Sequence, residues 1–124
     1  MKKIMMVDDE KDQIFSIKTA LETKYGGEYK IIPAESGEKC LEKLQKDEKP
    51  DLILLDIMMP EMDGWEVMDK IKANSSWKNI PIIFLTARSK NTSEKSGEDL
   101  GEDYIEKPIY IQDLKEKIDK ILKN

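Results

Sequence analysis

An acid stands at the end of a short, unbroken apolar run of this 124-residue chain: Leu52–Leu55 lies between Asp51 and Asp56. A short, unbroken aliphatic run indicates a strand that is buried on both faces. Asp56 therefore either caps the following loop or serves a site. The chain contains no histidine, which excludes Ser-His-Asp or Cys-His catalysis, His-ligated zinc and a phosphohistidine on this chain. Carboxylates, lysine, hydroxyls and backbone groups remain as candidates.

Other polar side chains follow apolar runs in the same way, and these are Asp8, Asp9, Thr86 and Lys107. Three carboxylates that meet at one place repel one another unless a cation or a proton relieves the charge. Oxygen-only ligands favour a hard ion, and Mg²⁺ binds through a few carboxylates while it keeps waters for a phosphate oxygen. A Thr hydroxyl and a Lys ammonium suit an incoming phosphoryl group, which an Asp can accept as an acyl phosphate. If these residues meet, they predict an aspartyl-phosphate site with Asp56 as the nucleophile.

Strand-like and helix-like apolar patterns alternate along the chain and would position these residues. Apolar runs predict strands at residues 4–7, 29–32, 52–55, 82–85 and 104–105. Apolar residues at near-helical spacing, Phe15 among them, predict helices over residues 12–25, 36–44, 65–71 and 111–122. The segment 89–100 is almost without apolar residues, so a helix there would be short and exposed. Five alternations favour a parallel sheet that is covered on both faces.

The composition of the strands predicts their order. Runs 4–7, 52–55 and 82–85 are wholly apolar and should be central, whereas 29–32 and 104–105 are interrupted or short and should lie at the edges. A doubly wound, flavodoxin-like α/β (βα)5 sheet of order 2-1-3-4-5 meets both demands, and its ligand site lies at the carboxyl ends of strands 1 and 3. The pattern predicts a single domain over residues 1–124.

Composition narrows the class of protein. The net charge of −5 disfavours direct binding to nucleic acid, whose phosphates attract basic surfaces. No run approaches the roughly 20 apolar residues of a membrane span, and Met1–Val7 lacks the features of a signal peptide. Cys40 is the single cysteine, so no internal disulfide can form, and it is interpreted as a core residue. These observations predict a cytoplasmic protein.

Four segments together carry a resemblance to a known family: Val7-Asp8-Asp9-Glu10, Leu55-Asp56-Ile57-Met58-Met59-Pro60-Glu61-Met62-Asp63-Gly64, Leu85-Thr86-Ala87 and Glu106-Lys107-Pro108. In this order and at these intervals they resemble the receiver domain of two-component response regulators, in particular its chemotaxis-regulator-like, single-domain members. The resemblance implies that Asp56 takes a phosphoryl group from the phosphohistidine of a sensor kinase or a phosphotransfer protein.

The same resemblance implies a Mg²⁺ site and no organic cofactor. Asp9 and Asp56 would bind the ion directly, together with the backbone carbonyl of Met58. Asp8 would act through a water molecule.

It also implies a switch. Thr86 would move toward the phosphoryl oxygen, Lys107 would pair with it, and Tyr104 would turn inward when Thr86 moves. The Lys107–Pro108 bond is expected to be cis.

Two positions that tune hydrolysis of the acyl phosphate in this family are Met58 and Arg88 here. An apolar Met beside the phosphoryl group and an added positive charge predict a long-lived phosphoryl group. The resemblance also indicates that the segment from Thr86 to Lys107 is one residue shorter than in many relatives, and this segment contributes to the usual output face.

Two alternatives to the leading hypothesis stay open. A pseudo-receiver would use the fold only to bind another protein. A phosphohydrolase of haloacid-dehalogenase type needs a second Asp two residues after the nucleophile, where this chain has Met58. In the leading hypothesis the protein is not a turnover enzyme, since it promotes only the modification of its own Asp56. It would act on a downstream protein partner or an output domain, and phosphorylation-dependent dimerisation is a further expectation.

Overall fold

The structure, a computed structural model, describes residues 1–86 and 103–122. Its strands are β1 (Lys2–Val7), β2 (Tyr29–Ala34), β3 (Leu52–Asp56), β4 (Ile82–Thr86) and β5 (Asp103–Glu106). Its helices are α1 (Lys11–Lys24), α2 (Gly37–Gln45), α3 (Gly64–Lys72) and α6 (Ile111–Leu122). All strand pairs are parallel, and the sheet order is β2-β1-β3-β4-β5. The doubly wound flavodoxin-like fold and the strand order predicted from the sequence are confirmed.

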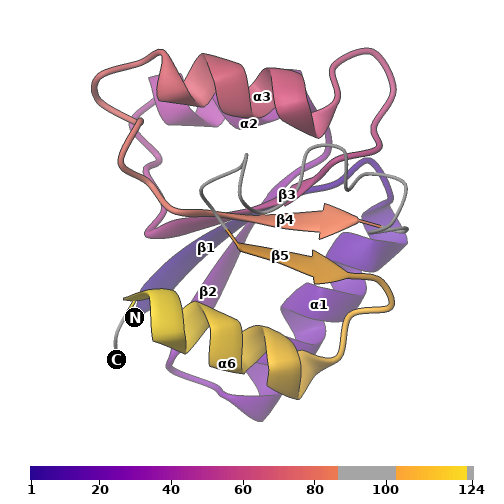
Figure 1. Cartoon of the computed structure of the whole chain (residues 1–124). Helices are drawn as coiled ribbons and strands as arrows, with labels where there is room; N and C mark the ends of the chain where they lie inside the picture. The colour runs from indigo at the N-terminus through magenta and orange to yellow at the C-terminus, as the bar shows by residue number, and fades with distance from the viewer. Residues whose placement is uncertain (87–102, 123–124) are drawn as a thin grey trace.

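The helices form a layer on each face of the sheet, with α2 and α3 on one side and α1 and α6 on the other (Figure 1). Successive residues of a strand point to opposite faces, so each central strand supplies both cores. Met5 and Val7 of β1 pack toward α2 and α3, whereas Ile4 and Met6 pack toward α1 and α6. Every residue of β3 is buried, which explains the unbroken apolar run that its sequence shows.

The register of the central strands brings their carboxyl ends together. Val7 pairs with Leu55 across β1 and β3, so Asp8 and Asp56 lie just beyond neighbouring positions. Asp56 pairs with Leu85 of β4, which places Thr86 one residue further along the same edge.

Capping side chains mark two of the helix starts. Ser36 accepts a hydrogen bond from the Lys39 N–H at the start of α2. Asp63 and Glu66 form a reciprocal capping box at the start of α3. The sequence anticipated both starts, because Ser36-Gly37 and Asp63-Gly64 are typical of turns that lead into helices.

Some expectations from the sequence were wrong in detail. Phe15 was counted with the apolar stripe of the first helix, but its side chain is 69% exposed. The buried stripe of α1 consists of Ile14, Ile17 and Leu21, and Phe15 lies next to it on the solvent side because neighbouring helical residues are about 100° apart. The short exposed helix expected at 89–100 lies outside the described residues. Within the described part of the chain, no helix is long and apolar enough to cross a membrane.

Candidate functional site

Three buried polar side chains gather at the carboxyl edge of the sheet. Asp8 is 0% exposed, Asp56 3% and Thr86 1%, and they are the buried polar residues among those that the structure describes. Each ends or directly follows a central strand, so a core that buries the strands also buries these groups. Burial of a charged or polar group is unfavourable unless it has a compensating partner. The site therefore calls for such partners.

The acids form one compact group. Asp8, Asp9 and Asp56 each place a carboxylate oxygen within 4.8 Å of those of the other two. Asp9 is exposed while Asp8 and Asp56 are buried, so the group opens to solvent on one side. An all-oxygen donor set of this kind fits a hard divalent ion such as Mg²⁺. Neither Asp8 nor Asp9 caps the first helix, because Glu10 is the N-cap residue of α1.

Lys107, the residue directly after β5, enters the same site. Its Nζ lies 3.4 Å from Asp8 Oδ2 and 3.7 Å from Asp56 Oδ1. The backbone N–H of Lys107 donates to the Thr86 carbonyl over 2.7 Å, which ties the lysine to the end of β4. The Lys107–Pro108 peptide bond is cis, as expected.

These neighbours act on the proton affinity of Asp56. Burial and the negative charges of Asp8 and Asp9 raise the pKa of the Asp56 carboxyl to about 6, although the Lys107 ammonium and the Met58 N–H oppose the rise. The Met58 N–H donates to Asp56 Oδ1 over 3.3 Å. The pKa remains raised because repulsion and desolvation outweigh the lysine. A divalent cation at the acids would remove this repulsion.

Gly64 has a role at the site that the sequence did not reveal. A Cβ at this position would lie 2.6 Å from the Asp56 carbonyl oxygen and 2.8 Å from the Ile57 Cα. The N–H of Gly64 donates to the Ile57 carbonyl over 2.9 Å. The start of α3 thus rests directly on the backbone of Asp56, and only glycine permits the approach. The Asp63-Gly64 pair looks like ordinary turn chemistry, so its sequence gave no signal of this contact.

The two methionines after Asp56 behave differently. Met59 is buried, with 8% of its surface exposed, and packs in the core. The Met58 side chain is 63% exposed, while its backbone contacts Asp56. Arg88, the other residue expected to affect hydrolysis, lies outside the described residues.

Glu10 is a further acid near the site that sequence reasoning passed over. Its Oε1 lies 4.0 Å from Lys107 Nζ, and its backbone N–H donates to Asp8 Oδ1 over 2.9 Å. Its position directly after the Asp8-Asp9 pair in the sequence could have indicated that Glu10 lies near the site. Three acids therefore surround one lysine.

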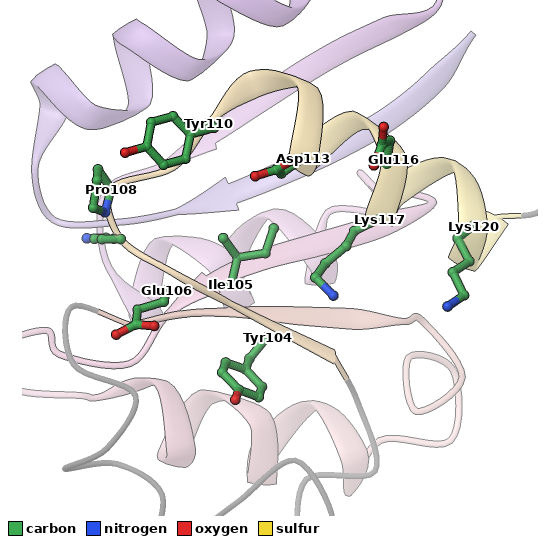
Figure 2. A pocket seen from close by; sticks show the side chains of 10 residues that line it. Tyr104, Ile105, Glu106, Pro108, Tyr110, Asp113, Glu116, Lys117 and Lys120 are labelled. Atoms are coloured by element: carbon green, nitrogen blue, oxygen red, sulfur yellow. The ribbon is translucent and has the colours of Figure 1, made fainter.

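Tyr104 lies on β5 at 42% exposure. It borders a groove of about 720 Å³ between β5 and α6, which Figure 2 shows with the Ile105 side chain on the α6 side of the strand. Ile105 packs in the core with Leu114 and Ile118 of α6. Thr86 and Tyr104 thus belong to two adjacent strands, because Phe84 pairs with Tyr104 and Thr86 with Glu106. Lys107 directly follows the second of these strands.

Comparison with known proteins identifies the family. The sequence profile of the response regulator receiver domain matches residues 4–119. The chain belongs to this receiver domain family of two-component signalling, as the resemblance implied.

Three similar proteins show where such domains occur. A probable cyclic di-GMP phosphodiesterase of Vibrio cholerae is 43% identical over 98% of this chain, which spans 26% of that protein. The alkaline phosphatase synthesis transcriptional regulatory protein PhoP of Bacillus subtilis is 36% identical over 98% of this chain, which spans 49% of it. The N-terminal domain of a response regulator receiver protein from Methanoculleus marisnigri JR1 is 38% identical over 100% of this chain and 98% of that one, with a TM-score of 0.77. The chain thus spans between a quarter and a half of the two full-length relatives.

Proposed function

We propose that this receiver domain, a single domain over residues 1–124, accepts a phosphoryl group on Asp56 from the phosphohistidine of a sensor kinase or a phosphotransfer protein. The observation that carries the proposal is the meeting of Asp8, Asp9, Asp56 and Lys107 at one edge of the sheet. A cluster with three acids, one lysine and a raised Asp56 pKa is costly for the fold, and such clusters are typical of functional sites.

Asp56 is the nucleophile in this proposal. A carboxylate oxygen of Asp56 forms a bond to phosphorus while the bond from phosphorus to the donor's imidazole nitrogen breaks, which leaves an acyl phosphate. Asp9, Asp56 and the Met58 carbonyl would hold a Mg²⁺ ion directly, and Asp8 would hold it through water. When bound, the ion neutralises charge that builds on the phosphoryl oxygens.

Lys107 and Thr86 bind the transferred group. The Lys107 ammonium, now 3.7 Å from Asp56 Oδ1, pairs with a phosphoryl oxygen, and the Thr86 hydroxyl donates a hydrogen bond to another. Movement of Thr86 draws Tyr104 inward and shifts the protein between two conformations. The partly exposed position of Tyr104 beside the β5–α6 groove supports this switch role.

The switch acts on another protein surface. A downstream partner, an output domain or a second copy of the chain would detect the change at β5 and α6. The protein modifies only its own Asp56 and does not turn over an external substrate. A cytoplasmic location stays a prediction.

We also expect a long-lived phosphoryl group. The Met58 backbone N–H donates to Asp56 and its side chain is exposed, which supports the idea that this apolar side chain hinders water from reaching the acyl phosphate. Replacement by Asn, together with Arg88→Glu, should shorten the half-life of the phosphorylated protein. An unchanged half-life would remove this idea.

Intact-mass measurement after incubation with Mg²⁺ and acetyl phosphate tests the proposal. We expect a single phosphoryl adduct that disappears with EDTA and in Asp56→Asn. Asp51→Asn is the matched control, because Asp51 precedes the same strand at its opposite end and should leave the adduct intact. Absence of an Asp56-dependent adduct would favour the pseudo-receiver. Turnover of phosphate monoesters would favour the hydrolase.

A further inference from the structure

A second groove lies beside β2, the strand at one edge of the sheet. It has a volume of about 740 Å³ and is bounded by the first residues of β1, by β2 and by the end of α2 with the loop after it. Its lining includes four lysines, Lys3, Lys30, Lys43 and Lys49, but only two acids, Asp47 and Glu48. This excess of positive charge contrasts with the net charge of −5 for the whole chain.

Two of these lysines repel each other because of the strand register. Lys3 pairs with Lys30 across β1 and β2, so both side chains leave the same face of the sheet from adjacent positions. Like charges that stand opposite each other on neighbouring strands destabilise a sheet. Asp51 accepts a hydrogen bond from the Lys3 backbone N–H, but among the described residues its carboxylate forms no ion pair with the Lys3 or the Lys30 ammonium.

Few acidic side chains neutralise the lysines of the groove. Lys43 pairs with Glu48 at 3.9 Å, whereas Lys3, Lys30 and Lys49 make no ion pair within the described part of the chain. The charge of Glu22 attracts the Lys30 ammonium, but the Glu22 carboxylate is bound directly to Lys18 at 3.0 Å and accepts the Ile31 N–H over 2.8 Å. An acidic ligand would relieve this repulsion.

The free edge of β2 argues against a ligand that binds as an additional strand of the sheet. The Ala34 carbonyl points toward β1, where it accepts the Asp8 N–H. Because backbone groups alternate in direction along a strand, the backbone groups of Ile31 and Pro33 point away from β1, toward the free edge of the sheet. The Ile31 N–H is taken by Glu22, and Pro33 has no N–H to donate. Addition of a further strand is therefore blocked, and a ligand must be held by side chains.

We propose that this groove, the Lys3–Lys30 groove, binds an acidic peptide segment of a partner protein. Its partly buried Ile32 and exposed Pro33 provide apolar contact beside the ammonium groups. Glutamates or aspartates with apolar residues between them complement both features. The lining of the groove contains none of the residues of the Asp56 site, so the proposal is independent of phosphoryl transfer.

A binding experiment with the full chain tests the groove. The probe is a short fluorescein-labelled peptide of glutamates interspersed with leucines, followed by fluorescence anisotropy at low salt. We expect Lys3→Gln/Lys30→Gln to weaken binding by about tenfold, because each ammonium contributes a charge-assisted contact. Lys70→Gln/Lys78→Gln is the matched control, since both lysines are exposed outside the groove, and it should bind like the parent protein.

Several results would overturn the proposal. These are equal weakening in the control pair, undiminished binding by the groove pair, equally tight binding of a peptide with glutamine in place of glutamate, or tighter binding of a single-stranded oligonucleotide of the same charge. A urea denaturation midpoint close to that of the parent protein would show that the groove pair is folded. The two proposals can thus fail separately.

Discussion

Replacement of Asp56 by Asn should stabilise the metal-free protein at neutral pH. The substitution keeps an oxygen that can accept the Met58 N–H but removes one charge from a group of three carboxylates within 4.8 Å. The structure therefore predicts that the residue most important for the proposed function opposes folding when no cation is present.

The pKa of Asp56 gives the size of the expected gain in the free energy of unfolding. Burial and the charges of Asp8 and Asp9 raise this pKa from 3.8 to about 6 despite Lys107. A shift of about two pKa units corresponds to about 3 kcal/mol. Since the acid group opens to solvent at Asp9, screening reduces the expected gain to about 1–2 kcal/mol.

The gain in stability from Asp56→Asn depends on pH. A carboxyl with a raised pKa in the folded state binds its proton more tightly there than in the unfolded chain. Its ionisation therefore destabilises the fold as pH rises through the window from about 4 to 6. The advantage of Asp56→Asn should be present at pH 7 and shrink strongly toward pH 4.

Urea denaturation with EDTA, at both pH values, measures this effect. Asp69→Asn, an exposed position on α3, is the control and should change stability little. Addition of Mg²⁺ should stabilise the parent protein by mass action and remove the advantage of the variant. The reasoning is refuted if Asp56→Asn is no more stable than the parent at pH 7, or if its gain is the same at pH 4.

Three further substitutions test the supports of the site and the fold. Gly64→Ala should destabilise by about 1–3 kcal/mol, because its Cβ would stand 2.6 Å from the Asp56 carbonyl; an unchanged urea midpoint would contradict this. Asp63→Ala should lose about 1 kcal/mol by removal of the capping box of α3, and a thermal melt that matches the parent would disprove the cap's contribution. Burial raises the pKa of Asp119, but hydrogen bonds from Lys115, Lys2 and Tyr29 outweigh it and lower the pKa to about 2. Asp119 thus stabilises the fold above about pH 4, and Asp119→Asn should cost about 1–2 kcal/mol at pH 7 in urea titrations. This difference should vanish toward pH 2, so a pH-independent difference would count against an ionic origin.

The strand order was predictable because burial leaves a direct mark on composition. A central strand of a parallel sheet is covered on both faces, so it needs an unbroken apolar run, as in residues 52–55. The same logic located the polar residues at the ends of these runs. Asp8, Asp56 and Thr86 could be placed at one edge because parallel strands point their carboxyl ends the same way.

Close approaches between distant residues were not predictable in this way. Nothing in the local sequence of Lys107 indicates that its ammonium lies 3.7 Å from Asp56. The exposure of Phe15 also escaped the pattern, because periodicity alone does not define how wide the buried stripe of α1 is.

The sequence by itself thus determined the fold, the strand order and the set of residues that could take part in phosphoryl chemistry. Tertiary structure alone decided that Gly64 rests on the Asp56 backbone and that Lys3 stands opposite Lys30. It also decided how far Lys107 offsets the acids around Asp56. The physical reason is that hydrophobic periodicity records which side of an element is buried. The distances between atoms depend instead on strand register and loop path, which the whole packed molecule sets together.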